Sequence, residues 1–248
     1  MYGMVYGGQR VNNTMTQQLN YDFTQAPLRN PDYFYPLSLT LDPKEKDNFV
    51  HTGLVQHQSK FVNSGISLSN VGNADQYFKN TMKLTNEFLA PLGVKTRRMT
   101  LFLGDSGTTS WAIHCDGVRD VNNAPARLEA RLSYYEIADA PGAIRWWDNL
   151  QNQLIVMPGN EYSQERITCM ADCAEDIREN KLTWADIPAP AFSTVTSAPS
   201  AILRTDRPHH VIQGPGLRVT VSYQLVFPDG NPTGVWEHIQ NNIHKLGV

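Results

Sequence analysis

Two strands joined by a tight turn are predicted in the segment RPHHVIQGPGLRVT, which spans Arg207–Thr220. The turn is Gly214-Pro215-Gly216, a combination that interrupts a strand. Apolar residues dominate the sequence on both sides of this turn and favour strands over His209–Ile212 and Leu217–Phe227. We expect these two strands to close a sheet together with a third strand, Ser200–Arg204.

The preceding sequence repeats this pattern of short strands separated by glycine and proline. Pro141-Gly142 and Gly104-Asp105-Ser106-Gly107 are turn sequences. The strands we expect are Val94–Leu103, Ser110–Asp116, Arg127–Ile137, Ala143–Trp147 and Gln151–Pro158. Many short strands with such turns are typical of an antiparallel sandwich or barrel. The predicted fold class is therefore mainly β, with flanking helices.

Three segments outside these strands favour helices. In the first, apolar residues recur every three or four positions after the candidate N-cap Asn73, and the helix ends before Gly93. In Glu161–Asn180, acidic residues come early and basic residues late, as the helix dipole prefers. A short helix is also expected in Asn231–Leu246. Pro188–Pro199 is rich in proline, alanine, serine and threonine and is predicted to be a loop.

Composition excludes several classes of protein. The 248 residues are 41% hydrophobic and carry a formal net charge of −3, which favours a globular chain over a disordered or strongly basic one. No apolar run approaches the roughly 20 residues of a membrane helix. The N-terminal sequence lacks the pattern of a secretory signal. We expect a cytoplasmic protein that binds neither nucleic acid nor membrane.

A histidine and a carboxylate lie two residues apart in His114-Cys115-Asp116. In an extended strand, residues i and i+2 point to the same face, so these two side chains converge. They supply two of the three ligands of a 2-His-1-carboxylate site, which leaves positions open on non-haem Fe(II). Taken alone, the pair is equally consistent with a surface hydrogen bond.

Arg218 lies within the apolar strand Leu217–Phe227. A buried guanidinium is unfavourable unless it meets an anion, and its planar fork suits a carboxylate. An internal aspartate or glutamate would satisfy it as well as a bound ligand would.

Together, these elements resemble the Fe(II)/2-oxoglutarate-dependent oxygenases, and in particular the aspartyl/asparaginyl β-hydroxylase and proline cis-hydroxylase branch. The resemblance covers roughly Arg97–Phe227, with an extra segment near Asp148–Thr183. The matching elements are His114-Cys115-Asp116, Arg127-Leu128-Glu129-Ala130-Arg131-Leu132, His209-His210-Val211 and Arg218.

The resemblance implies a double-stranded β-helix, the cupin-like jelly roll, with iron at its mouth. It makes His114, Asp116 and His209 the metal ligands, and it places Arg218 on the distal carboxylate of 2-oxoglutarate. Further candidate contacts to this cosubstrate are Arg131, Thr220 and Ser222. It also implies Fe(II), 2-oxoglutarate and O₂ as cofactor and cosubstrates of a hydroxylase, with succinate as a product.

Asp116 bears on the reaction, because related halogenases have glycine or alanine at this position. A carboxylate there favours hydroxylation of a small molecule, for which a free amino acid is one candidate, or of a peptide side chain. Residues 1–248 would form a single oxygenase-like domain. Its parts would be a jelly-roll core at about 94–227, an insertion at about 148–183 and an N-terminal scaffold at 1–93.

Several alternatives stay open. His210 is the fallback for His209, because neighbouring strand residues point to opposite faces; otherwise it is expected to face solvent. A non-catalytic cupin-like module and a metal enzyme that does not use 2-oxoglutarate are the competing functions. Cys169 and Cys173, four residues apart on a predicted helix, are expected to be structural. The substrate and the oligomeric state are not predicted.

Overall fold

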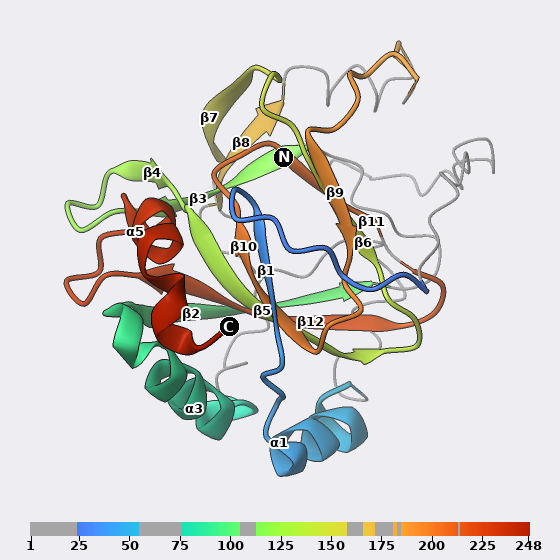
Figure 1. The fold of residues 1–248 in the computed structure, drawn as a ribbon, viewed down its shortest axis with the longest axis vertical. Helices are drawn as coiled ribbons and strands as arrows, with labels where there is room; N and C mark the ends of the chain where they lie inside the picture. Colours follow the sequence, from blue (N-terminus) through green and yellow to red (C-terminus); the bar gives the residue numbers. More distant parts are fainter. Residues whose placement is uncertain are drawn as a thin grey trace, which may run out of the picture.

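The structure is a computed structural model that describes residues 24–54, 76–104, 113–157, 166–171, 181–182, 185–212 and 214–248. It contains two antiparallel sheets (Figure 1). The strands of the five-stranded sheet are β1 (Phe34–Leu37), β2 (Lys95–Gly104), β5 (Ala130–Ala138), β10 (Ser200–Arg204) and β12 (Arg218–Val226). Their order across the sheet is β1-β10-β5-β12-β2.

The second sheet has seven strands and packs against the first through a shared apolar cluster. Its strands are β3 (His114–Arg119), β4 (Pro125–Arg127), β6 (Ala143–Trp146), β7 (Asn152–Met157), β8 (Arg166–Ala171), β9 (Phe192–Val195) and β11 (His209–Ile212). They run in the order β7-β8-β3-β11-β6-β9, and β4 pairs with β3 outside this path. Two antiparallel sheets with few helices confirm the predicted jelly-roll class.

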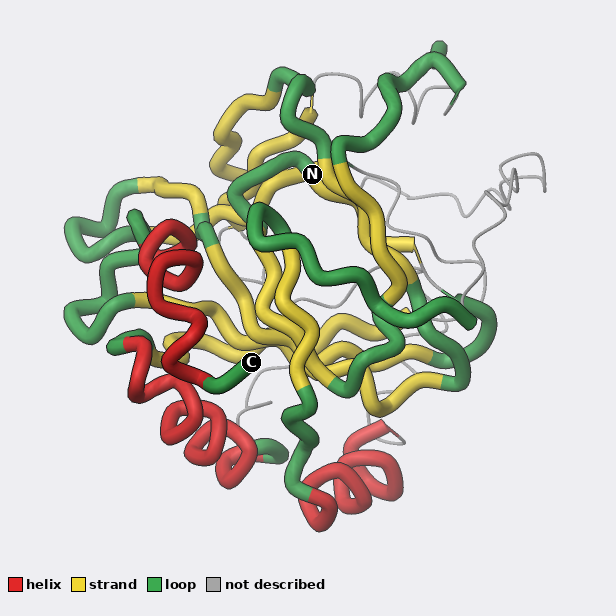
Figure 2. Tube along the Cα trace, in the orientation of Figure 1, coloured by secondary structure: helices red, strands yellow, loops and turns green. Residues whose placement is uncertain are grey.

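The helices gather on one side of the strands (Figure 2). They are α1 (Pro43–Asn48), α3 (Lys79–Leu89) and α5 (Val235–Asn242). Shorter helices follow them: the π-helical turn η2 (Phe49–Gly53) and the 3₁₀ helices η4 (Ala90–Leu92) and η5 (Ile243–Leu246). In the part of the chain that the structure describes, no helix is long and apolar enough to cross a membrane.

Two apolar clusters fix the position of the five-stranded sheet. On its outer face, side chains of β12 such as Val221 and Leu225 pack with Leu89 of α3 and with Trp236 and Ile239 of α5. The second cluster joins the two sheets through β1, β5, β6 and β10, and includes Phe34, Tyr135, Ile144, Trp146 and Leu203. The five-stranded sheet is therefore buried on both faces.

Several strands have the bounds expected from the sequence. β10 and β11 match their predicted ranges, and β12 begins and ends one residue inside Leu217–Phe227. The predicted strand Arg127–Ile137 is divided between β4 in one sheet and β5 in the other, with Leu128 and Glu129 between them. The C-terminal helix is present as α5 and η5. The first predicted helix begins at Lys79, whereas Asn73 lies outside the described residues.

The helix predicted over Glu161–Asn180 is wrong where the structure describes this segment. Residues 166–171 form β8, which pairs with β7 and with β3. The early acidic and late basic residues have the order of a helix, but pairing with two distant strands determines the local conformation. β7 and β8, the described strands of this segment, therefore extend the seven-stranded sheet beside β3.

Two further strands were not expected. β9 lies in the predicted loop Pro188–Pro199 and pairs with β6. β1 lies in the predicted scaffold and pairs with β10. β1 contains Pro36, which has no N–H to donate, and the strand is tolerated because it forms an edge of its sheet.

Candidate metal and cosubstrate site

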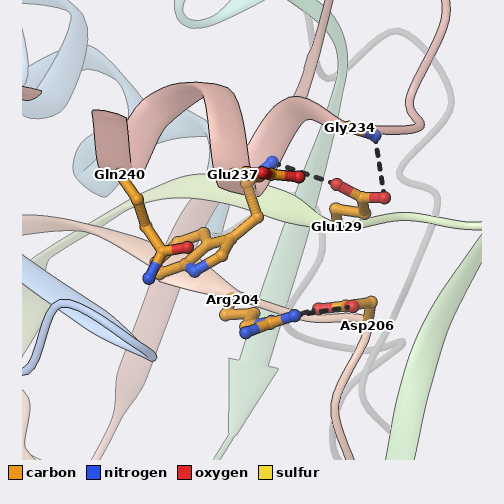
Figure 3. Close-up of a pocket in the computed structure, with 7 residues that line it drawn as sticks. Glu129, Arg204, Asp206, Gly234, Glu237 and Gln240 are labelled. Carbon is orange, nitrogen blue, oxygen red and sulfur yellow. Dashed lines mark hydrogen bonds and ion pairs between the residues drawn. The ribbon is translucent and has the colours of Figure 1, made fainter. Parts of the chain in front are cut away.

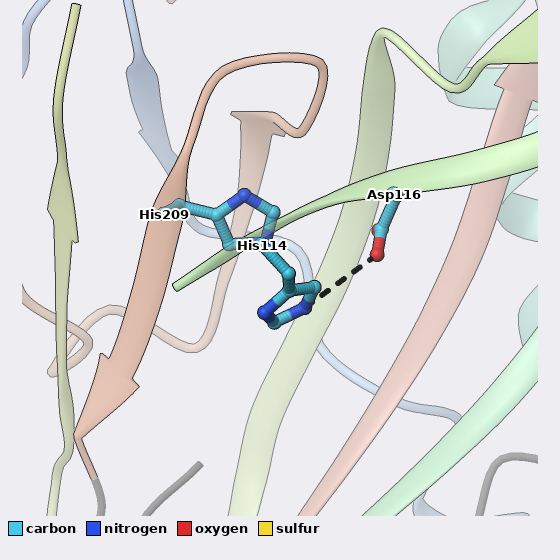
Figure 4. Close-up of side chains that lie close together, drawn as sticks. All are labelled: His114, Asp116 and His209. Carbon is cyan, nitrogen blue, oxygen red and sulfur yellow. Dashed lines mark ion pairs between the residues drawn. The ribbon is translucent and has the colours of Figure 1, made fainter. Parts of the chain in front are cut away.

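β3 carries two of the predicted ligands on one face of the seven-stranded sheet. His114 is the first residue of β3, and Asp116 follows two positions later, so both side chains point to the same side. His114 Nε2 lies 3.8 Å from Asp116 Oδ1, and the side chains are 16% and 15% exposed. Figure 4 shows the two side chains turned toward each other. Because both side chains are partly exposed, a ligand from solution can reach them.

His209 comes to the same place from β11. In the register of β11 with β3, His209 is the direct partner of His114, and the two imidazole centroids are 4.6 Å apart. One ligand atom from each of His114, Asp116 and His209 lies within 4.8 Å of the other two. We call these three residues the His–Asp–His cluster (Figure 4).

The orientation of His209 is determined by a backbone contact. Its Nδ1 lies 2.9 Å from the carbonyl oxygen of Arg207. When Nδ1 carries the proton and donates it to this carbonyl, Nε2 keeps its lone pair, which is the arrangement of most metal-bound histidines.

His210 is not part of the cluster. It follows His209 in β11, where its backbone is paired with Arg145 of β6, and alternation sends it to the opposite face. His209, and not His210, therefore lies close to His114 and Asp116. His210 is only 4% exposed, so its expected solvent-facing position was wrong.

Asp116 is an anion in a partly buried position. Burial favours its neutral form, but the charges of Arg131, His209 and His114 outweigh burial and lower the pKa of Asp116 from 3.8 to about 2. Arg131 also donates a hydrogen bond from Nε to Asp116 Oδ2. At neutral pH Asp116 is therefore a carboxylate that lies beside the two histidine side chains.

Arg218 lies at the start of β12 and is 4% exposed. Its Nη1 is 3.4 Å from the carbonyl oxygen of Ile212, and its guanidinium lies 5.2 Å from the ring centroid of Tyr135. Burial lowers the pKa of Arg218 from its usual value. Among the described residues, no carboxylate pairs with it. The internal acid that would have made Arg218 a purely structural residue is therefore not found in that part of the chain.

β12 has one apolar face and one polar face, although all nine residues are buried. The polar face consists of Arg218, Thr220, Ser222 and Gln224. Ser222 Oγ lies 2.8 Å from Ser133 Oγ of β5, so its hydroxyl already has a protein partner. Thr220 is 8% exposed and stays available as a contact on the Arg218 side.

Arg131 and Arg218 lie at opposite ends of the β5–β12 ladder. Arg131 is paired with Gln224, whereas Arg218 is paired with Ala138. The two arginines thus lie on the same pair of strands, but only Arg131 contacts the cluster.

Two residues near Arg218 were not singled out from the sequence. A Cβ atom placed on Gly142 would lie 1.9 Å from Arg218 Nη1 and 2.6 Å from Ile212 O, so only glycine leaves room for the guanidinium. Tyr135 packs against the same group. The Pro141-Gly142 turn was visible in the sequence, but its contact with Arg218 depends on the pairing of β6 with β11.

The cysteines are not arranged as expected. Cys115 is buried on β3, and its backbone partner across the ladder is Cys169 of β8. Cys169 therefore does not lie on a helix, and Cys173 lies outside the described residues.

Two surface cavities lie away from the cluster. One of about 330 Å³ is lined by Arg204 of β10, by residues of α5 and by Glu129, which precedes β5. There, Glu129 accepts hydrogen bonds from the backbone N–H groups of Gly234 and Trp236 (Figure 3). The other, of about 370 Å³, is lined by residues that include Lys46, Glu136 and Thr196. Neither includes a residue of the His–Asp–His cluster.

No protein-family model and no curated protein matches the chain. Among solved structures, HygX from Streptomyces hygroscopicus, with nickel and 2-oxoglutarate bound, has 10% identity and a TM-score of 0.44, over 79% of this chain and 83% of its own. EvdMO1 has 14% identity and a TM-score of 0.38, over 79% of this chain and 47% of its own. These are distant similarities of shape, and we build the proposed function on the residues of this chain.

Proposed function

We propose that this chain is an Fe(II)/2-oxoglutarate-dependent dioxygenase that hydroxylates a small molecule, such as a free amino acid, or a peptide side chain. The proposal is carried by one observation: the interior of the protein holds both a candidate metal site and a buried arginine that could bind a carboxylate. The His–Asp–His cluster suits a divalent metal, and the buried Arg218 has no acidic partner among the described residues. A dicarboxylate cosubstrate matches both.

The donor set fits Fe(II). Two imidazole nitrogens and one carboxylate oxygen form the 2-His-1-carboxylate pattern, which leaves coordination positions open. His114, Asp116 and His209 would hold the ion, with His209 oriented by the Arg207 carbonyl. When bound, Fe(II) with 2-oxoglutarate and O₂ supplies the oxidising chemistry, in which 2-oxoglutarate is decarboxylated to succinate.

The surroundings of Arg218 fit the distal carboxylate of 2-oxoglutarate. β11 begins at His209 and ends at Ile212, whose carbonyl contacts Arg218. The three residue steps from His209 to Ile212 span roughly 10 Å along the strand, a separation suited to a five-carbon dicarboxylate with its other end at the metal. Arg218 would bind the carboxylate through its planar fork, and the Thr220 hydroxyl would add a contact on the same face.

The first test is anaerobic addition of Fe(II) and 2-oxoglutarate. We expect a weak visible charge-transfer band that is absent in His114→Ala. His238→Ala is a matched control, because His238 lies on α5 and contacts the Leu92 carbonyl; this variant should keep the band. A wild-type protein that shows no band and binds no iron would contradict the proposal.

The competing functions give different results in the same experiment. Iron binding without 2-oxoglutarate binding would favour a metal enzyme of another kind. A folded protein that binds neither would favour a non-catalytic module. If both bind, succinate release screened across free amino acids and peptides identifies the substrate class, and a product mass increased by one oxygen atom establishes hydroxylation.

A further inference from the structure

The two carboxylate oxygens of Asp116 have different neighbours. Oδ2 accepts a hydrogen bond from Arg131 Nε and forms an ion pair with it. Oδ1 is the oxygen that lies 3.8 Å from His114 Nε2. One oxygen is thus occupied by the protein, while the other faces the imidazoles.

Arg131 is itself held in place. Its Nη1 lies 3.5 Å from Thr100 Oγ1, and its guanidinium lies 5.6 Å from the ring centroid of Phe102. Both neighbours belong to β2, whereas Arg131 belongs to β5. The side chain is 8% exposed, and its position is determined by these contacts with β2 and by the ion pair with Asp116 of β3.

Arg131 and Arg218 are both buried, but they differ in what they contact. Arg131 has an acidic partner within the protein, and Arg218 has none among the described residues. A carboxylate ligand that approached Arg131 would have to compete with Asp116 for the guanidinium. Arg218 is therefore better suited than Arg131 to bind the cosubstrate. The role of Arg131 lies in its contact with Asp116.

We propose that Arg131 is a positioning residue that holds Asp116 Oδ2, so that Asp116 binds the metal through Oδ1 alone. This inference rests on the proposed function, because it concerns the ligands of the same site. A carboxylate that binds through one oxygen uses one coordination position, whereas one that chelates uses two. Arg131 would therefore keep one more position open, so that O₂ can bind beside 2-oxoglutarate, and it does not bind 2-oxoglutarate itself.

The test compares Arg131→Gln and Arg131→Lys with wild type, using Co(II) as the metal probe. Glutamine removes the charge and the fork, and lysine keeps the charge but loses the planar fork. Arg204→Gln is the matched control, because Arg204 pairs with Asp206 at 2.7 Å outside the cluster. Three quantities are measured: Co(II) affinity, the visible absorption of the Co(II) protein, and 2-oxoglutarate affinity at saturating Co(II).

We expect Arg131→Gln to lower Co(II) affinity by about 10- to 100-fold, the usual effect of losing a residue that orients a metal ligand. The Co(II) spectrum should also change, because the number of ligand atoms changes. The 2-oxoglutarate affinity should stay near that of wild type. Arg131→Lys should be intermediate, and Arg204→Gln should leave all three quantities unchanged.

The proposal is overturned if Arg131→Gln leaves Co(II) affinity and spectrum unchanged, or if it weakens 2-oxoglutarate more than Co(II). If Arg131→Gln does not fold by circular dichroism, Arg131→Lys decides by the same criteria. The Co(II) measurements need no cosubstrate. A wild-type protein that binds Co(II) but not 2-oxoglutarate would therefore disprove the proposed function and leave the positioning role to be judged separately.

Discussion

The two ends of the β5–β12 ladder differ in their balance of charge. At one end, the positive charge of Arg131 is neutralised by Asp116. At the other, Arg218 is buried beside Tyr135 and a backbone carbonyl, without a carboxylate among the described residues. An arginine with an internal partner supports the folded protein, whereas one without such a partner is suited to receive an anion. We therefore interpret Arg131 as a charge neutralised within the protein, and we propose that Arg218 receives a ligand.

The largest expected effect is on the stability of the metal-free protein. Arg131→Met should lower the free energy of unfolding by about 3–5 kcal/mol, because it leaves the Asp116 carboxylate buried without its partner. Arg218→Met should leave stability unchanged or raise it, because it removes an isolated buried charge. Chemical denaturation of both variants measures the contrast. If both variants lost the same free energy of unfolding, Arg218 would have a structural partner after all.

A smaller effect is expected at acid pH. The folded-state pKa of Asp116 is lowered from 3.8 to about 2, so its contribution to stability is present above pH 4 and is lost as the pH falls through 2. The size of that contribution is about 2 kcal/mol. Denaturation of the metal-free protein between pH 5 and about pH 2 measures it, with Asp116→Asn as the variant that should lack it. If Asp116→Asn lost as much stability as wild type at acid pH, the effect would belong to other titratable groups.

The smallest effect concerns the space around Arg218. Gly142→Ala would place a methyl group against Arg218 Nη1 and the Ile212 carbonyl. We expect 2-oxoglutarate affinity to fall roughly tenfold, about 1.4 kcal/mol, with metal affinity unchanged. Gly93→Ala is the control, because a Cβ there meets nothing within 4 Å, although its left-handed backbone costs some stability. Unchanged cosubstrate affinity in Gly142→Ala would place the ligand elsewhere.

Local sequence patterns were sufficient to predict the bounds of several strands. β10 and β11 match their predicted bounds because each strand follows a proline, Pro199 or Pro208, and β11 ends before the turn that begins at Gly214. The i, i+2 spacing of His114 and Asp116 was enough to place both on one face of a strand. Their approach to His209 requires the pairing of β3 with β11, which the resemblance implied and the spacing alone did not.

Non-local pairing explains the features that were missed. β8 was expected to be helical because its flanking charges have a helical order, yet it forms a strand between β3 and β7. The contact of Arg131 with Asp116 was not predicted, because it joins two sheets that no short sequence window connects. The neighbours of Arg218, Tyr135 and Gly142, were missed for the same reason.

The most direct measurement is a calorimetric titration of 2-oxoglutarate into the Fe(II)-loaded protein under anaerobic conditions, compared between wild type and Arg218→Met. Wild type should bind one 2-oxoglutarate per chain, and only when the metal is present. Arg218→Met should bind it about 10- to 100-fold more weakly, as expected for the loss of a charged hydrogen-bond partner, with unchanged Fe(II) affinity. A wild-type protein that does not bind 2-oxoglutarate, or a variant that binds it equally well, would contradict the proposed site.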